Sequence, residues 1–381
     1  MDNKICFETE VVRGASGGDE RTGAISFPIY QSATFKHPGL NKSTGYDYSR
    51  LQNPTVEELE KTVCNLEQGK GAIAFSTGLA AITACIHLFK SGDHIILSED
   101  LYGGTSRLFE KIYNNFGIES SFVDTTNLDE VNSSIKKNTK GILIETPSNP
   151  TMKVTDIREI SKISKKNNLI FIVDNTFLTP YFQKPLTLGA DIVVHSGTKY
   201  LGGHNDVLSG IVISNKEDIV EKIRYIQVST GATLGAFEAW LLLRGIKTLH
   251  VRLDRAEENA IKIANWLKDN NKVEDVYYVG LEDNEGYELN KSQSSGFGTT
   301  LSFRVKDSSI VPKLLERVRV ICYAESLGGV ETLITYPITQ THAEVSDELK
   351  KKLGIDDKLL RLAVGIENIS DLIEDLKQGL E

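Results

Sequence analysis

Short apolar runs alternate with longer amphipathic stretches from about residue 60 to residue 215. Several runs show no alternation of apolar and polar side chains, which is typical of strands that are covered on both faces. The pattern predicts an α/β fold with a mainly parallel sheet between helices. The predicted strands are GAIAFS at 71–76, HIILSE at 94–99, GILIETP at 141–147, LIFIVDN at 169–175, DIVVHSG at 191–197 and LSGIVIS at 208–214.

Helices are predicted between these strands at 55–69, 155–168 and 216–229. The first is expected to start with Thr55 as its N-cap and to stop at Gly69. A long helical region at 235–270 follows. The strands predicted at 298–306, 318–328 and 331–337, with a helix between them, and a closing helix at 369–380 indicate a second, smaller α/β domain.

Residues 1–60 show no strong periodic element and are rich in Gly, Ser, Thr, Tyr and Pro around GYDYSRLQNPT at 45–55. Such a segment is typical of an extended arm that carries functional loops. An arm that cannot bury its own surface usually lies on a neighbouring chain. We therefore expect an arm at 1–58, a large domain at 59–245 and a smaller domain at 246–381.

The charge pattern limits the class of partner. The formal net charge is −9, with no block of five or six like charges, which disfavours nucleic acid and anionic membranes as partners. Cysteines 6, 64, 85 and 322 form no CxxC pair, and the histidines show no metal-ligand spacing. We expect buried free thiols, no metal site, and a soluble cytoplasmic protein without a signal peptide or membrane span.

Ligands of a parallel sheet bind beyond the carboxyl ends of its strands, so the residues after each apolar run are the candidates for chemistry. FSTGLAAI ends a strand and opens a helix, placing the N–H groups of Gly78 and Leu79 where a phosphate could bind, although a plain turn explains this equally well. Asp174 ends a buried strand and needs a cation, or else caps a helix. Lys199 follows the most apolar strand, where burial lowers the pKa of an amine.

Together these three features provide a phosphate cradle, a carboxylate for a pyridinium nitrogen and an amine for a Schiff base. Pyridoxal 5′-phosphate requires all three. The glycine motifs that nicotinamide and P-loop enzymes need are absent. The residues alone therefore favour a pyridoxal-phosphate enzyme.

The segment DIVVHSGTKYLGGHN at 191–205 resembles, throughout its length, the lysine signature of the cysteine and methionine metabolism family of pyridoxal-phosphate enzymes. The similarity continues in order through YDYSRLQNPT, STGLAAI, LYGGTSRLF, ETPSNPT, VDNTFLTP, AESLGGVETL, THA and LLRLAVGIE. It covers nearly the whole chain. It implies the fold type I architecture of pyridoxal-phosphate transferases, with the cofactor bound by the domain at 59–245.

The resemblance also implies roles for individual residues. It makes Lys199 the catalytic lysine that carries the cofactor, places Asp174 on the pyridine nitrogen, and stacks Tyr102 on the ring as a possible acid or base. Further cofactor-binding residues that it implies are Gly78, Leu79, Thr176, Ser196 and Thr198. Tyr48 and Arg50 would reach the phosphate of the neighbouring subunit, in a dimer within a homotetramer.

For the substrate, the resemblance assigns the carboxylate to Arg361, assisted by Asn149 and Ser326. Asp47 and Glu325 match positions where cystathionine γ-synthases and γ-lyases carry acids that face the distal ammonium of cystathionine or cysteine. The alternative is that both are solvated loop acids. From the residues alone, Arg361 would be a surface charge. The implied substrates are small sulfur amino acids.

Within the family we expect a cystathionine γ-synthase or γ-lyase, with cystathionine β-lyase as the nearest alternative. Methionine γ-lyases carry a cysteine where this chain has Gly104, and O-acylhomoserine sulfhydrylases are generally longer. Leu51, Tyr336 and Gln340 depart from common family residues on the substrate side. An aminotransferase or a non-catalytic pyridoxal-binding protein are the hypotheses from other classes.

Overall fold

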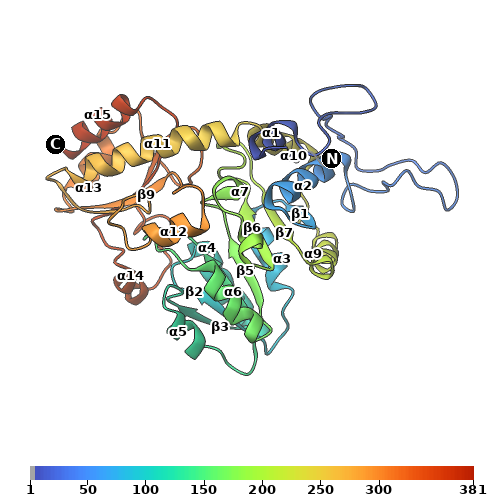
Figure 1. Cartoon of the computed structure of the whole chain (residues 1–381), viewed down its shortest axis with the longest axis horizontal. Helices are drawn as coiled ribbons and strands as arrows, with labels where there is room; N and C mark the ends of the chain where they lie inside the picture. The colour runs from blue at the N-terminus through green and yellow to red at the C-terminus, as the bar shows by residue number, and fades with distance from the viewer. Residues whose placement is uncertain (1–4) are drawn as a thin grey trace.

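Two β-sheets organise the chain in the computed structural model, which describes residues 5–381 (Figure 1). The larger sheet has seven strands in the order β1-β7-β6-β5-β4-β2-β3. All its pairings are parallel except those of β7, which runs antiparallel to both β1 and β6. The predicted mainly parallel sheet is confirmed. Its strands are β1 Gly71–Phe75, β2 His94–Ser98, β3 Glu119–Val123, β4 Thr139–Glu145, β5 Ile170–Asp174, β6 Ile192–Ser196 and β7 Gly210–Ser214.

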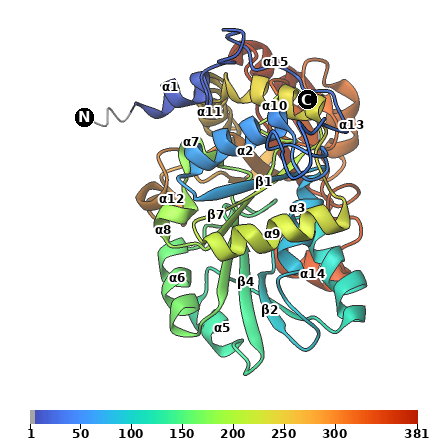
Figure 2. The ribbon, with the colours of Figure 1, turned by 90° about the vertical axis from the view of Figure 1, so that its right-hand side faces the viewer.

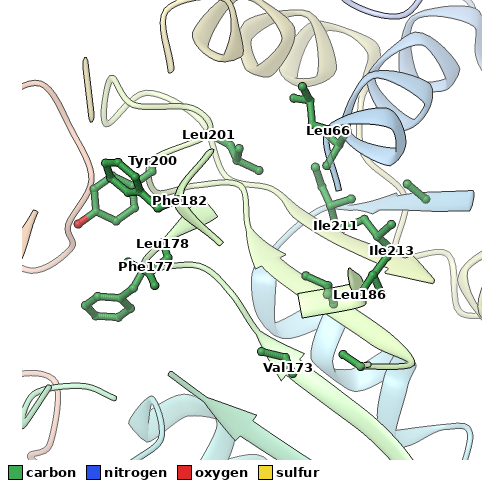
Figure 3. Close-up of a cluster of buried hydrophobic side chains, with 14 of the residues drawn as sticks. Leu66, Val173, Phe177, Leu178, Phe182, Leu186, Tyr200, Leu201, Ile211 and Ile213 are labelled. Carbon is green, nitrogen blue, oxygen red and sulfur yellow. The ribbon is translucent and has the colours of Figure 1, made fainter. Parts of the chain in front are cut away.

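Helices cover both faces of this sheet, as the unbroken apolar strands require. One face packs against α3 (Gly78–Ile86) and α9 (Glu217–Thr230), and α9 crosses the strands in Figure 2. The other face packs against α2 (Pro54–Glu67), α6 (Ile157–Lys166) and α8 (Pro185–Leu188). Figure 3 shows part of this second core, where Leu66 of α2 lies near Ile211 and Ile213 of β7.

Strand β3 is absent from the sequence prediction because its segment ESSFV is largely polar. It pairs only with β2 at the edge of the sheet, so it needs no apolar run. The remaining helices of the large domain are α4 Gly103–Arg107, the π-helix η1 Leu108–Ile112, the 3₁₀-helix η2 Tyr113–Phe116, α5 Leu128–Ser133, α7 Thr179–Phe182 and α10 Ala236–Ile246.

Helix α2 starts earlier than predicted. Its N-cap is Asn53, whose side chain accepts a hydrogen bond from the backbone N–H of Thr55, and not Thr55 itself. Asparagine caps helices better than threonine, and Pro54 suits the first helical position because its fixed φ matches the helix and its missing N–H is not needed there. Thr55 instead uses its hydroxyl to tie down the arm, donating to the carbonyl oxygen of Pro28. At the other end Gln68 adopts the left-handed conformation, one residue before Gly69.

The N-terminal segment contains one helix that the sequence pattern does not reveal, α1 (Phe7–Arg13), which packs against α2 and α11. Helix α1 has a single fully buried side chain, Val11, which is too little for a periodic signal. Residues 14–53 form no further helix or strand apart from isolated bridges. They reach out from the large sheet as the dark-blue loops of Figure 1.

The smaller sheet has five strands in the order β10-β11-β12-β9-β8. The predicted helical region at 235–270 splits into α10 and α11 at Lys247 and Thr248. The strand predicted at 318–328 is reduced to two residues, and positive φ values of 99° at Ser326 and 82° at Gly328 take the chain after it out of the β region. The elements are α11 Leu249–Lys268, β8 Val273–Tyr277, α12 Tyr287–Gln293, β9 Thr300–Val305, α13 Ile310–Arg317, β10 Cys322–Tyr323, β11 Leu333–Thr335, α14 Asp347–Leu353, β12 Leu359–Ala363 and α15 Ile369–Leu380.

The two faces of the smaller sheet differ in character. One packs against α11, α13 and α15 through apolar residues such as Phe303 and Leu362. Because side chains alternate along a strand, Arg361 lies on the opposite face, where its cross-strand neighbours are Ser302 and Thr335. This polar face takes part in the site described below.

Two further sequence expectations concern the surface. Cys64 and Cys85 are buried free thiols as expected, but Cys6 and Cys322 are exposed, because they lie at the start of α1 and in the short strand β10. Within residues 5–381, no helix is long and apolar enough to cross a membrane.

The small core depends on Phe303, a fully buried side chain of β9, which lies between β12 and β8 in the smaller sheet. We expect Phe303→Ala to lower the free energy of unfolding by about 3–5 kcal/mol, because the change leaves a cavity that the core cannot fill. Trp266 packs against the same core and reports on it, so urea unfolding followed by fluorescence in a Trp240→Phe background measures the loss. Phe116→Ala, at a 68% exposed position, is the control and should change little.

Candidate active site

A cavity of about 260 Å³ lies where the carboxyl ends of β4, β5 and β6 meet the polar residues of the smaller sheet. It contains twelve of the predicted site residues, and only Asp47, Tyr48 and Arg50 lie elsewhere. The twelve are Gly78, Leu79, Tyr102, Asn149, Asp174, Thr176, Ser196, Thr198, Lys199, Glu325, Ser326 and Arg361. The strand-end rule and the resemblance therefore identify residues that converge in space.

Lys199 is placed by a tight turn that follows β6. Its backbone N–H donates to the carbonyl oxygen of Ser196, and its own carbonyl accepts from the N–H of Gly203, which needs a positive φ of 72°. The amine donates to the hydroxyl oxygen of Ser326 at 2.9 Å. Burial, together with the positive charge of Arg361, lowers the pKa of Lys199 to about 8.

Asp174 is the last residue of β5, and its carboxylate faces the cavity. One oxygen accepts two hydrogen bonds from Thr176, from the backbone N–H at 3.0 Å and from the hydroxyl at 2.6 Å. Burial raises the pKa of Asp174, and the bonds from Thr176 oppose that rise by favouring the charged form. The Thr176 hydroxyl also accepts from the N–H of Ser196, which joins β5 to the lysine turn.

The start of α3 forms a close backbone cradle. Thr77 caps this helix by accepting from the N–H of Ala80, which leaves the N–H groups of Gly78 and Leu79 without helical partners at the cavity wall. Only glycine fits at 78, because a Cβ atom there would lie 2.9 Å from the side chain of Ser196. A Cβ at Gly210 would lie 2.1 Å from the carbonyl oxygen of Thr77. The strands and the helix start are thus pressed together.

Tyr102 follows β2 and stands at the mouth of the cavity with a side chain that is 44% exposed. Its ring lies over Gly104, where a Cβ atom would come within 2.5 Å of the ring carbon Cε1. Its backbone N–H donates to the carboxyl oxygen Oε2 of Glu145 at 2.9 Å. The ring and the backbone of Tyr102 are therefore each held by one neighbour.

Arg361 is almost completely buried, although the residues alone suggested a surface charge. Its guanidinium donates to the side-chain oxygen of Asn149 at 3.0 Å, to the carbonyl oxygen of Ser326 at 2.7 Å and to the hydroxyl of Thr335 at 3.1 Å. Burial lowers the pKa of Arg361 to about 10. Its Nε atom is buried without a hydrogen-bond partner among the described residues.

Ser326 links the two cationic side chains of the site, since its hydroxyl meets Lys199 and its carbonyl meets Arg361. A positive φ of 99° is unusual for serine and carries strain, which these two contacts offset. Gly328 follows closely, and a Cβ there would lie 2.6 Å from the backbone nitrogen of Tyr200. The loop after β10 is thus fitted against the lysine turn.

Some residues of the cavity wall were not assigned to the site from the sequence. Glu145 could have been found, because it ends β4 as Asp174 ends β5. Phe177 and Thr341 lie in the motifs VDNTFLTP and THA but were given no site role, and Leu208 was expected to start a strand that begins at Gly210.

The three remote residues lie on the arm. Arg50 donates to the carbonyl oxygen of Val228 in α9 at 2.9 Å, and the ring of Tyr48 lies near its guanidinium. Asp47 contacts Ser43 and His37 within the arm. None of the three lines the cavity of its own chain, so their predicted roles require a second subunit.

Comparison with known proteins agrees with this geometry. The model of the family described as "Cys/Met metabolism PLP-dependent enzyme" matches residues 8–381. This chain belongs to that family. It is therefore a pyridoxal-phosphate-dependent enzyme with the fold type I architecture that the resemblance implied.

Several relatives match this family member over nearly its whole length. It is 50% identical to a cystathionine γ-lyase of Bacillus subtilis over 98% of this chain and 99% of the relative. It is 48% identical to a cystathionine β-lyase of Lactococcus lactis over 98% of each. A solved cystathionine γ-lyase of Lactobacillus plantarum in complex with L-serine superposes with a TM-score of 0.95 at 42% identity, covering 98% of both chains.

The residues of this family member fit its cofactor on structural grounds. Asp174 is a carboxylate that faces the cavity and whose burial calls for a cation, and the unpartnered N–H groups at the start of α3 suit a phosphate. The Lys199 amine, with its lowered pKa, is nucleophilic enough to react with an aldehyde.

The burial of Lys199 predicts a stability effect in the cofactor-free protein. Its folded pKa of about 8 lies below the ordinary value of 10.5, so the folded state disfavours the charged amine. The stability of the wild type should rise with pH between about 8 and 10.5, because the unfolded chain binds more protons there. Lys199→Met should stabilise the cofactor-free protein at pH 7 by up to about 3 kcal/mol, and this gain should vanish above pH 10.5.

Thermal unfolding of both proteins across this pH range measures the effect. A loss of stability in Lys199→Met at pH 7 would contradict a destabilised lysine. Lys70→Met, at an exposed lysine paired with Glu217, is the control and should show no such gain.

Proposed function

We propose that this enzyme acts on the γ carbon–sulfur bond of cystathionine, as a γ-lyase or γ-synthase. The observation that carries the proposal is that one cavity holds a lysine of lowered pKa, a buried arginine with a free donor, and the acid Glu325. The named relatives support the same substrate class. A β-lyase is the second candidate, because the Lactococcus relative with that name is nearly as similar.

In this proposal Arg361 binds the carboxylate of the amino acid. Its buried Nε atom is a donor without a protein acceptor, and a planar carboxylate is the ligand that a guanidinium binds best. Asn149 and Ser326 hold the guanidinium in place through its other nitrogens. The strong hydrogen bonds to Arg361 orient the α-carbon of the substrate toward the lysine.

Lys199 moves the protons. With a pKa of about 8, its Nζ atom can take a proton from the α-carbon near neutral pH and return it later in the reaction. The bound cofactor supplies the conjugated ring that accepts the electrons released at that carbon. Asp174 would hold a negative charge next to the ring nitrogen of the bound cofactor. Tyr102 would cover the ring and exchange a proton with the departing group.

Glu325 supports a substrate with a second amino group. It lines the cavity beside Ser326, and its charge acts on Lys199 and Arg361. An acid at this position would pair with the distal ammonium of cystathionine.

We also propose that the active unit contains two chains. Residues 59–245 would hold the cofactor, residues 246–381 would supply Arg361, and the arm at 1–58 would carry Asp47, Tyr48 and Arg50 to the site of the neighbouring subunit in a homotetramer. Tyr48 is exposed and does not line the cavity of its own chain, and both observations support this arrangement. The free thiols accord with a reducing, cytoplasmic location.

Product analysis tests the reaction. With L-cystathionine we expect cysteine and 2-oxobutyrate, or newly made cystathionine when an acylated homoserine and cysteine are given. Homocysteine and pyruvate would instead identify a β-lyase. Glu325→Gln should raise the KM for cystathionine by about tenfold, since a charged hydrogen bond is lost, and leave the KM for O-acetylhomoserine, which lacks the distal ammonium, unchanged.

Mixing experiments test the shared site. Arg50→Ala and Lys199→Ala should each be nearly inactive, and co-expression of the two should restore roughly a quarter of wild-type activity, because half of the randomly formed dimers contain one intact site of two. The control pair is Lys199→Ala with Arg361→Ala, whose residues line one cavity of one chain and which should not recover. Equal recovery in both mixtures, or none in the first, would contradict the shared site.

A further inference from the structure

Glu145 is a buried acid at the cavity wall for which the proposed chemistry has no use. It is the last residue of β4 and is 5% exposed. In the parallel pairing of β4 with β5 it stands directly opposite Asp174. Neighbours opposite one another in a sheet extend their side chains to the same face, so both acids border the same cavity.

Its hydrogen bond reaches the backbone that carries the aromatic ring of the site. The carboxyl oxygen Oε2 of Glu145 accepts from the backbone N–H of Tyr102 at 2.9 Å. Tyr102 is the residue that precedes α4, and its ring rests on Gly104. Glu145 is itself buried and fixed in the sheet, so this hydrogen bond holds the main chain at Tyr102 in place.

The charges around Glu145 disfavour a second negative charge. Asp174 on β5 and Asp100 after β2 lie near it, and a negative charge on either one raises the pKa of Glu145. Arg361 of β12 is the cation that faces it, but hydrogen bonds to Asn149, Ser326 and Thr335 already engage that guanidinium. Burial and the nearby Asp174 raise the pKa of Glu145 well above its usual range.

We propose that Glu145 is a positioning residue: its carboxyl group accepts the hydrogen bond of the Tyr102 backbone N–H and fixes the main chain there, so that the ring would lie over the bound cofactor. This rests on the proposed role of Tyr102 in the site. The raised pKa of Glu145 beside Asp174 favours its neutral form, in which it would not compete with Asp174 for the positive ring nitrogen of the cofactor. Glu145 itself transfers no proton and touches no reacting atom.

Two substitutions separate the acceptor from the charge. Glu145→Gln keeps an oxygen acceptor and removes the ability to ionise, whereas Glu145→Leu removes the acceptor at similar volume. In the cofactor-free protein, hydrogen–deuterium exchange of the peptide that contains Tyr102 should speed up in Glu145→Leu and stay at the wild-type rate in Glu145→Gln. The Kd for pyridoxal 5′-phosphate should rise roughly threefold to tenfold in Glu145→Leu, the effect of one hydrogen bond, and stay within about twofold in Glu145→Gln.

A matched control is Glu60→Gln, a change at another buried acid, which accepts from the N–H of Ala74 and pairs with Arg224 far from Tyr102. It should not change the exchange at Tyr102. If Glu145→Leu does not fold, Glu145→Ala replaces it, with thermal unfolding as the check. If Glu145→Gln changes the amide exchange and the Kd as much as Glu145→Leu does, the site needs a charged carboxylate and the proposal fails. Unchanged exchange at Tyr102 in every variant also overturns it.

Amide exchange is measured without substrate or cofactor. A failure to cleave cystathionine would therefore count against the proposed function and leave this result standing. Altered exchange with unchanged cofactor affinity would show that the position of Tyr102 does not matter for binding, which contradicts the positioning role.

Discussion

The site depends on the burial of a lysine amine in the same cavity as an arginine. Both side chains would be positive in water. Burial lowers the pKa of Lys199 to about 8, with a further contribution from the charge of Arg361, and burial alone lowers that of Arg361 to about 10. Burying the charged amine costs stability, but it gives a lysine of which a larger fraction is neutral, and so able to react, near neutral pH. Ser326 holds the arrangement together through one contact with each side chain.

The acids of the site are buried in the same cavity, where a charged group needs hydrogen bonds or a partner of opposite charge. Asp174 and Glu145 are the last residues of adjacent strands in a sheet that is apolar on both faces. Their carboxyl groups therefore lie at the carboxyl ends of the strands and not within the apolar core. Thr176 donates two hydrogen bonds to Asp174 and so favours its charged form, while Glu145 receives only one from Tyr102. The two neighbouring carboxyl groups are thus hydrogen-bonded differently, as the two proposed roles require.

The sequence predicts the central sheet well because its strands are short apolar runs that end in polar residues. Lys199, Asp174 and Gly78 follow from that rule alone. Edge strands such as β3 and β8 escape prediction, because exposed strands need no apolar pattern. The cap of α2 was assigned to Thr55 and belongs to Asn53, since the pattern cannot tell which of two neighbouring cap formers the backbone uses. The burial of Arg361 depends on the packing of the small sheet against the large one, which no local pattern shows. Its assignment came from the family resemblance.

The central claim is that Lys199 carries the cofactor, and trapping that bond tests it most directly. The purified enzyme is treated with borohydride, which reduces a Schiff base to a stable amine, and its peptides are analysed by mass spectrometry. We predict that the reduced pyridoxyl group is found on Lys199 and that Lys199→Ala loses both the visible absorption of the enzyme and the modified peptide. A pyridoxyl group on another lysine, or full turnover by Lys199→Ala, would contradict the account.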